Sequence, residues 1–127
     1  MSRWMLALAG GCVLCGCSVS SVQPPVVLDV AYDLHCGHGP GVVLAEQGQQ
    51  LLVALGSRPN PGHQLLINAS MNSDGEVSVH YSEQLPQPGM MQAQVMTSPC
   101  GRVALPAQWT SMTVVDDVSG ANWQFFH

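Results

Sequence analysis

The chain has 127 residues, of which 46% are hydrophobic and only 9% are charged, and its formal net charge is −5 at pH 7. The length suits one small domain behind a targeting segment, and the apolar fraction argues against an intrinsically disordered chain. Because the charge is negative and lysine is absent, a phosphate backbone is excluded as a natural partner, and we expect no nucleic-acid binding.

The first 16 residues have the features of a bacterial secretion signal. Arg3 supplies a positive charge, and the apolar run Trp4–Leu14 follows it. A membrane-spanning helix needs about 20 apolar residues, so this run is too short to cross a bilayer. The next four residues, Leu14-Cys15-Gly16-Cys17, resemble a lipobox, in which cleavage before the last cysteine leaves that residue as a lipidated N-terminus. One alternative is an ordinary secretory signal with incidental cysteines. The other is a single membrane helix, which the glycines of this stretch would interrupt.

We therefore predict that Cys17 is lipidated and that residues 17–25 tether a single domain, residues 26–127, to a membrane. One acyl chain gives marginal binding, whereas two or more hold a protein firmly. Serine rather than aspartate follows the cysteine, which by resemblance to Gram-negative lipoproteins favours the periplasmic face of the outer membrane. Removing residues 1–16 leaves 111 residues, with two arginines against eight carboxylates and thus a net charge of −6.

After Pro25 the sequence shows strand signals and almost no helix signals. The turn signal Asn72-Ser73-Asp74-Gly75 separates two alternating runs, which makes residues 64–82 the clearest hairpin. Residues 43–55, rich in Ala, Leu and Gln, could also be helical. The strand candidates in chain order are 26–32, 42–44, 51–55, the two halves of 64–82, 91–96, 102–105, 111–115 and 123–126. This spacing predicts an all-β fold, either a small antiparallel β-sandwich or a partly open barrel.

Individual positions carry further expectations. In 26–32, the side chains of Val26, Leu28, Val30 and Tyr32 should share one face of a strand. We expect Trp109 and Met96 in the core. The aromatic tail, residues 123–127, should pack as an edge strand or present an anchor to a partner.

Two cysteines, Cys36 and Cys100, remain in the mature chain. In an oxidising periplasm they are a natural disulfide pair, and the bond would close a loop of about 64 residues and contribute about 4 kcal/mol of stability. A buried thiol or a catalytic thiol is the alternative. The tetrad His35-Cys36-Gly37-His38 also suits zinc or copper, with His35, Cys36 and His38 as ligands. A metal site needs three or four ligands, and no second cluster supplies them, so metal binding is the second hypothesis and no cofactor is expected.

Three short segments resemble the C-terminal domain of the PrcB family. These segments are Asn60-Pro61-Gly62-His63, Glu83-Gln84-Leu85-Pro86-Gln87-Pro88-Gly89 and Gln94-Val95-Met96-Thr97-Ser98-Pro99. The family comprises small β-rich domains, often in bacterial lipoproteins, and is named for a protease complex subunit. The resemblance covers about residues 56–106 and implies a non-enzymatic domain that stabilises a partner protease. The chain departs from the pattern at 61–63, where the family more often has Gly-Gly-Tyr, and at Cys100, where an aromatic residue is common.

The residue types in these segments have their own physical interpretation. Proline restricts φ and lacks a backbone donor, so Pro86, Pro88 and Gly89 should form a stiff loop. We expect Gln94, Thr97 and Pro99 to support this loop structurally. The alternative for both groups of residues is that they form a binding surface. Residues 83–89 and 94–100 are where we would first look for a partner.

No set of residues indicates catalysis. A nucleophile elbow is absent from the sequence, and the adjacent carboxylates Asp116 and Asp117 should point to opposite faces of a strand. The leading hypothesis is therefore a membrane-tethered, non-catalytic interaction or stabilisation module for a protease or envelope complex. It binds a protein partner and takes no small-molecule substrate.

Overall fold

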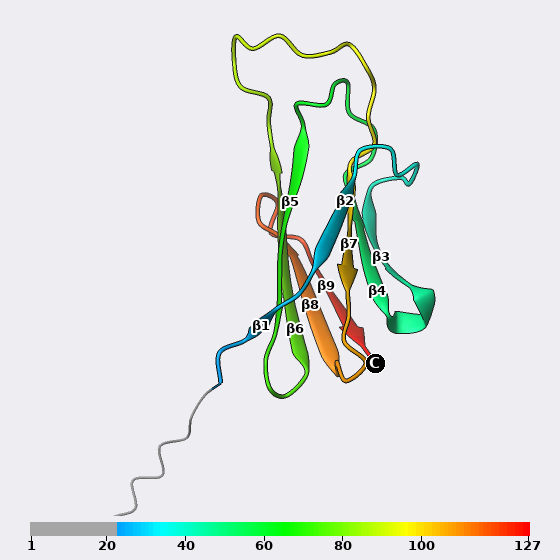
Figure 1. Ribbon diagram of the computed structural model, residues 1–127, viewed down its shortest axis with the longest axis vertical. Helices are drawn as coiled ribbons and strands as arrows, with labels where there is room; N and C mark the ends of the chain where they lie inside the picture. Colours follow the sequence, from blue (N-terminus) through cyan, green and yellow to red (C-terminus); the bar gives the residue numbers. More distant parts are fainter. Residues whose placement is uncertain (1–22) are drawn as a thin grey trace, which may run out of the picture.

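The computed structural model describes residues 23–127, which form two β-sheets and no α-helix (Figure 1). The strands are β1 (Val26–Val27), β2 (Val30–Asp33), β3 (Gly41–Ala45), β4 (Gln50–Ala54), β5 (Gln64–Met71), β6 (Glu76–Gln84), β7 (Cys100–Ala104), β8 (Ser111–Asp116) and β9 (Asn122–Phe126), with the 3-10 helix η1 (Glu46–Gly48). The all-β prediction is confirmed, as two open sheets. The predicted signal peptide, Cys17 and most of the tether lie outside the described residues. No helix in residues 23–127 is long and apolar enough to cross a membrane.

The two sheets have different strand orders. One sheet has the order β1-β5-β6-β8-β9, and the other has β2-β7-β4-β3. Neighbouring strands are antiparallel except β6 and β8, which pair in parallel from Glu76↔Ser111 to Tyr81↔Asp116. The chain leaves β6, forms β7 in the opposite sheet and returns beside β6 in the same direction. The purely antiparallel prediction is therefore wrong for this pair.

The predicted strand 26–32 is divided between the two sheets. β1 pairs with the end of β5, whereas β2 pairs with β7. Between them, Leu28 is buried and donates its backbone N–H to the carbonyl of Ala69 at 2.9 Å. The chain thus changes sheets at Leu28–Asp29. The prediction that the alternating residues share one face is wrong, since Leu28 is buried whereas Val26 is 61% exposed and Tyr32 is 54% exposed.

The core lies between the sheets and confirms the interior position of Trp109. Its indole is 2% exposed, and the indole N–H donates to the carbonyl of Gly48 at 2.7 Å. In β9, Trp123 and Phe125 pack against the core, so the tail is an edge strand, as one of the two alternatives predicted. The fully buried aliphatic side chains come from both sheets: Leu51, Val53, Val79, Val103, Met112 and Val114.

The strand candidates 42–44 and 51–55 are confirmed as the β3–β4 hairpin, whose turn places Glu46 and Gln47 at φ values of 54° and 55°, and the helical alternative for residues 43–55 is wrong. Two further predictions are wrong. Residues 91–96 form no strand and join neither sheet. Met96 is 69% exposed and lies outside the core.

Candidate functional site

Two long loops project together from one end of the sandwich (Figure 1). The first, residues 55–63, joins β4 to β5, and the second, residues 85–99, joins β6 to β7. We call these two loops the tip. The described chain begins at Gln23 at the opposite end, near the β5–β6 turn.

An ion-pair network holds the two loops together at their base. The guanidinium of Arg58 donates from Nε and Nη2 to the carboxylate of Glu83, at 2.9 and 2.8 Å. The Nδ1 atom of His63 lies 2.7 Å from the same carboxylate. All three side chains are largely shielded from water, with exposed fractions between 16% and 27%. The hydrogen bonds from Arg58, followed by those from His63, hold the pKa of Glu83 below its ordinary value against the opposing effect of burial.

A second link joins the loops through Thr97. Arg58 and Thr97 exchange backbone hydrogen bonds at 2.8 and 2.9 Å, and the Thr97 hydroxyl donates to the carbonyl of Asn60 at 3.3 Å. Thr97 is buried at 4% exposure. Pro99 is fully buried, and its carbonyl accepts a hydrogen bond from the N–H of Leu55 at 3.0 Å. These contacts fix the end of the second loop that precedes β7 to the first loop.

A third contact supports the middle of the second loop. Gln92 and Pro86 lie against Gly62 so closely that an added Cβ there would come within 2.8 Å of the Gln92 amide carbon and 2.9 Å of Pro86. Gln92 is half-buried, whereas Gln94 is exposed and makes no side-chain hydrogen bond in the structure. The bracing role expected of Gln94 is therefore wrong, and Gln92, two residues earlier, makes the supporting contact that the sequence did not reveal.

The surface of the second loop is apolar and uncharged. Of the thirteen large hydrophobic side chains exposed in residues 23–127, five lie between Leu85 and Met96. They are Leu85, Met90, Met91, Val95 and Met96, and Met91 is 98% exposed. No charged residue occurs from 84 to 101. Methionine is flexible and polarisable, and it is common at surfaces that bind proteins.

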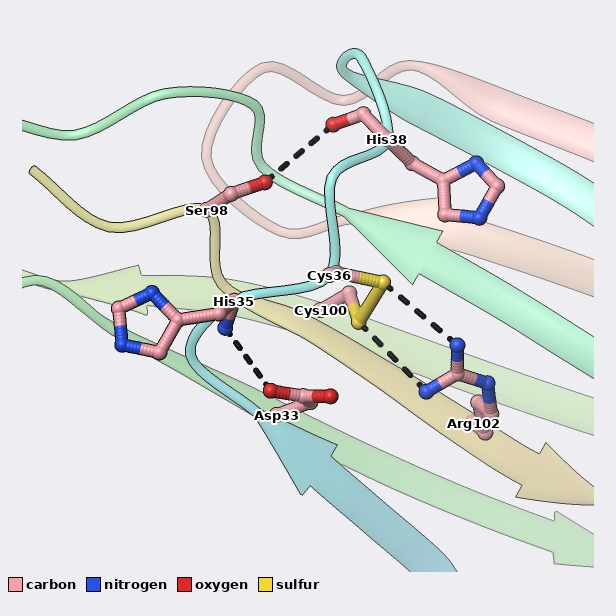
Figure 2. Close-up of a disulfide and its surroundings, with 7 residues drawn as sticks. All are labelled: Asp33, His35, Cys36, His38, Ser98, Cys100 and Arg102. Carbon is pink, nitrogen blue, oxygen red and sulfur yellow. Dashed lines mark hydrogen bonds between the residues drawn. A yellow bond between two sulfur atoms is a disulfide. The ribbon is translucent and has the colours of Figure 1, made fainter.

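A disulfide between Cys36 and Cys100 lies at the foot of the second loop (Figure 2). Their Cα atoms are 5.8 Å apart. Backbone hydrogen bonds between Cys36 and Ser98 (3.0 Å) and between Ser98 and Leu34 (2.7 Å) run beside the bond. The guanidinium of Arg102 lies against both sulfur atoms, at 3.8 and 4.0 Å. The disulfide thus fixes the segment after β2 to the start of β7.

This disulfide consumes the thiolate that a metal site at 35–38 requires. Figure 2 shows the imidazoles of His35 and His38 pointing to opposite sides of the disulfide. The backbone N–H of His35 donates to Asp33, and the carbonyl of His38 accepts from Ser98. Within residues 23–127, no group of three His, Cys, Asp or Glu side chains is placed to hold a metal ion.

The adjacent carboxylates Asp116 and Asp117 serve local structure. Asp116 accepts hydrogen bonds from the backbone of Val118 and Ser119 and so closes the turn after β8. Asp117 pairs with His80 of β6 at 2.8 Å, and both side chains are about half exposed. These two neighbours therefore act in separate places, with different partners.

The tip coincides with the part of the chain that resembles known proteins. No curated protein and no solved structure matches this chain significantly. A family model described as PrcB C-terminal matches residues 51–106, from the second residue of β4 to just beyond β7. The matched segment contains both loops of the tip and begins five residues before the segment predicted from the sequence. Residues 51–106 therefore match the PrcB C-terminal family model, as the resemblance predicted.

Proposed function

We propose that this protein is a non-catalytic accessory subunit of a protease complex, anchored to the outer membrane through lipid on Cys17 and bound to its partner through the tip. The observation that carries the proposal is that the PrcB C-terminal match, residues 51–106, contains both loops of the tip. The sandwich itself then serves as the frame that holds these loops.

The tip has the composition and the support of a protein-binding surface. Interface centres are depleted of charge and enriched in aromatic residues and methionine, and Met90, Met91 and Met96 are exposed on an uncharged segment. The links through Glu83 and Thr97 hold the loops in place before a partner arrives. Such preorganisation lowers the conformational entropy that is lost on binding.

The position of the tip also favours this role. Gln23 and the tip lie at opposite ends of the molecule (Figure 1). A lipid at Cys17 would precede Gln23 by only six residues, which span about 20 Å at most when extended. An anchor attached there leaves the tip free to face a partner.

Site-specific photo-crosslinking in membranes tests the proposal. A photoreactive residue is placed at Met91 of the full-length lipoprotein, and the matched control carries it at Ser73, an exposed position at the opposite end. We expect mass spectrometry to identify one envelope protein, a protease or a subunit of one, from Met91 and not from Ser73. Equal products from both positions, or none from Met91, would contradict the proposal.

The anchor is tested separately. Cys17→Ala should block lipidation and move the protein from the membrane to the soluble fraction, and Cys15→Ala is the matched control that should leave the protein in the membrane. Metabolic labelling with a palmitate analogue followed by fractionation measures both effects. A Cys17→Ala protein that is still labelled and still membrane-bound rules out this anchor.

A further inference from the structure

The strand β5 is paired on both sides only at its C-terminal end, and we propose that its N-terminal half is a strand-addition site. An extended segment of another protein pairs there with the main chain of β5, and places a large apolar side chain in a hollow between the two sheets. The site lies outside the two loops of the tip, and it does not depend on what the tip binds.

Alternate residues of β5 direct their main-chain groups away from β6. At the end of the β5–β6 hairpin, the N–H of Asn72 donates to the carbonyl of Glu76 at 3.0 Å, so these two residues face each other as a hydrogen-bonded pair. Hydrogen-bonded and non-hydrogen-bonded pairs alternate along an antiparallel ladder. The residues of β5 whose N–H and C=O groups point outward are therefore Leu65, Ile67, Ala69 and Met71.

The chain itself supplies an added strand to one half of this edge. β1 pairs antiparallel with the last two residues of β5, and the N–H of Leu28 then donates to the carbonyl of Ala69 at 2.9 Å. Beyond that point the chain leaves this edge and enters the other sheet as β2. A strand that continued the line of β1 would run past Ile67 and Leu65.

A side chain takes the place of that strand at Ile67. The hydroxyl of Tyr32 accepts a hydrogen bond from the N–H of Ile67 at 3.0 Å and donates to its carbonyl at 3.3 Å, so it binds the two groups that a neighbouring strand would bind. Within residues 23–127, Leu65 has no corresponding partner for its outward groups. Unpaired main-chain groups at a sheet edge bind extended backbone, which identifies the occupant as a strand.

The hollow beside this edge selects the side chain of the occupant. It measures about 340 Å³ and is lined by residues of both sheets, among them Tyr32, Leu34, Leu65 and Leu66. A residue paired opposite Leu65 has its side chain on the same face of the sheet as Leu65, which is the inner face. The apolar lining favours a large apolar side chain at that position.

The charge beside the hollow also restricts the occupant. Asp33 is among the residues that line it, and its carboxylate accepts a hydrogen bond from the backbone N–H of His35 at 2.8 Å. The chain as a whole is negatively charged. Both charges repel an acidic segment, so the occupant is neutral or basic.

Fluorescence anisotropy with a synthetic peptide tests the proposal on the full-length lipoprotein in phosphatidylcholine nanodiscs. The probe is a labelled, end-blocked heptapeptide of threonine with a central leucine. It should bind saturably, and a version methylated on alternate backbone nitrogens should bind at least about tenfold more weakly because it lacks the donors that pair with β5. A version with aspartate on both sides of the leucine should also bind more weakly.

Two variants locate the bound peptide. Tyr32→Phe should strengthen binding about tenfold, because the peptide no longer displaces the hydroxyl from Ile67, whereas Tyr81→Phe removes the hydroxyl of the other tyrosine and should change nothing. Leu66→Asp places a charge beside the hollow and should weaken binding at least about tenfold, whereas Val118→Asp is the exposed control. Thermal melting checks that each variant is folded.

Three results would overturn the proposal: no saturable binding of the neutral peptide, equal binding of its methylated version, or an affinity that Tyr32→Phe and Leu66→Asp leave unchanged. The proposed function is judged separately, because crosslinking from Met91 reports on the tip. A partner captured at Met91 equally well by the natural protein and by Leu66→Asp keeps the accessory role, whatever the peptide does.

Discussion

Reduction of the Cys36–Cys100 disulfide should lower the free energy of unfolding by about 4 kcal/mol. The two cysteines are 64 residues apart, and closing such a loop removes about that much conformational free energy from the unfolded chain. In a domain of about 100 residues, 1 kcal/mol moves the melting temperature by about 4 °C, so we expect a decrease of about 16 °C. Differential scanning calorimetry with and without reductant measures the effect.

Reduction tests the crosslink more cleanly than substitution does. Cys100 is 1% exposed and packs against Leu52 and Ala54, so replacing it adds a cavity to the lost bond. The Cys36→Ala/Cys100→Ala double variant is the control, and reductant should leave its melting temperature unchanged. Thiol titration must show complete reduction of the natural protein. If its melting temperature then falls by less than about 5 °C, the chain-entropy reasoning is refuted.

Three further changes test the tip and the core. Glu83→Gln removes a carboxylate whose pKa Arg58 lowers. The resulting loss in the free energy of unfolding, measured with urea, should be largest at pH 7 and should disappear as the pH falls below the lowered pKa of Glu83. A loss that does not depend on pH would contradict this. Gly101→Ala should cost about 1–3 kcal/mol in the same assay, because its Cβ would overlap Ile67 of the facing sheet, and a neutral effect would contradict that packing. Trp109→Ala should cost about 3–5 kcal/mol and remove the most buried tryptophan emission, unlike the exposed substitution Val118→Ala.

Local signals in the sequence were sufficient for the β5–β6 hairpin. Alternating apolar residues on both sides of Asp74-Gly75 predicted residues 64–82, and the strands pair from Gln64↔Gln84 to Met71↔Val77. Gly75 has a φ of 80°, and an added Cβ there would lie 2.7 Å from the carbonyl of Gln108. Turn chemistry and period-two alternation both act within a few residues, which is why a single sequence reveals them.

Contacts between distant residues were not predictable in the same way. The parallel pairing of β6 with β8 depends on where β7 lies, and the change of sheets at Leu28 depends on two different partner strands. Likewise, Arg58 and His63 meet Glu83 across 25 and 20 residues. The sequence held two clues to this network. Glu83 begins a segment that resembles the PrcB family, and Arg58 is one of only two arginines in the predicted mature chain.

The wrong prediction at residues 91–96 has a physical meaning of its own. Met91, Val95 and Met96 gave the segment an apolar, strand-like composition, yet it pairs with no strand of either sheet. Disagreement between local preference and observed structure is expected where a sequence serves binding rather than stability. A segment that favours an extended conformation, but is paired with no strand of its own chain, is suited to pair with a strand of another. The same property that made it look like a strand of the sandwich therefore supports its proposed role in contact with a partner.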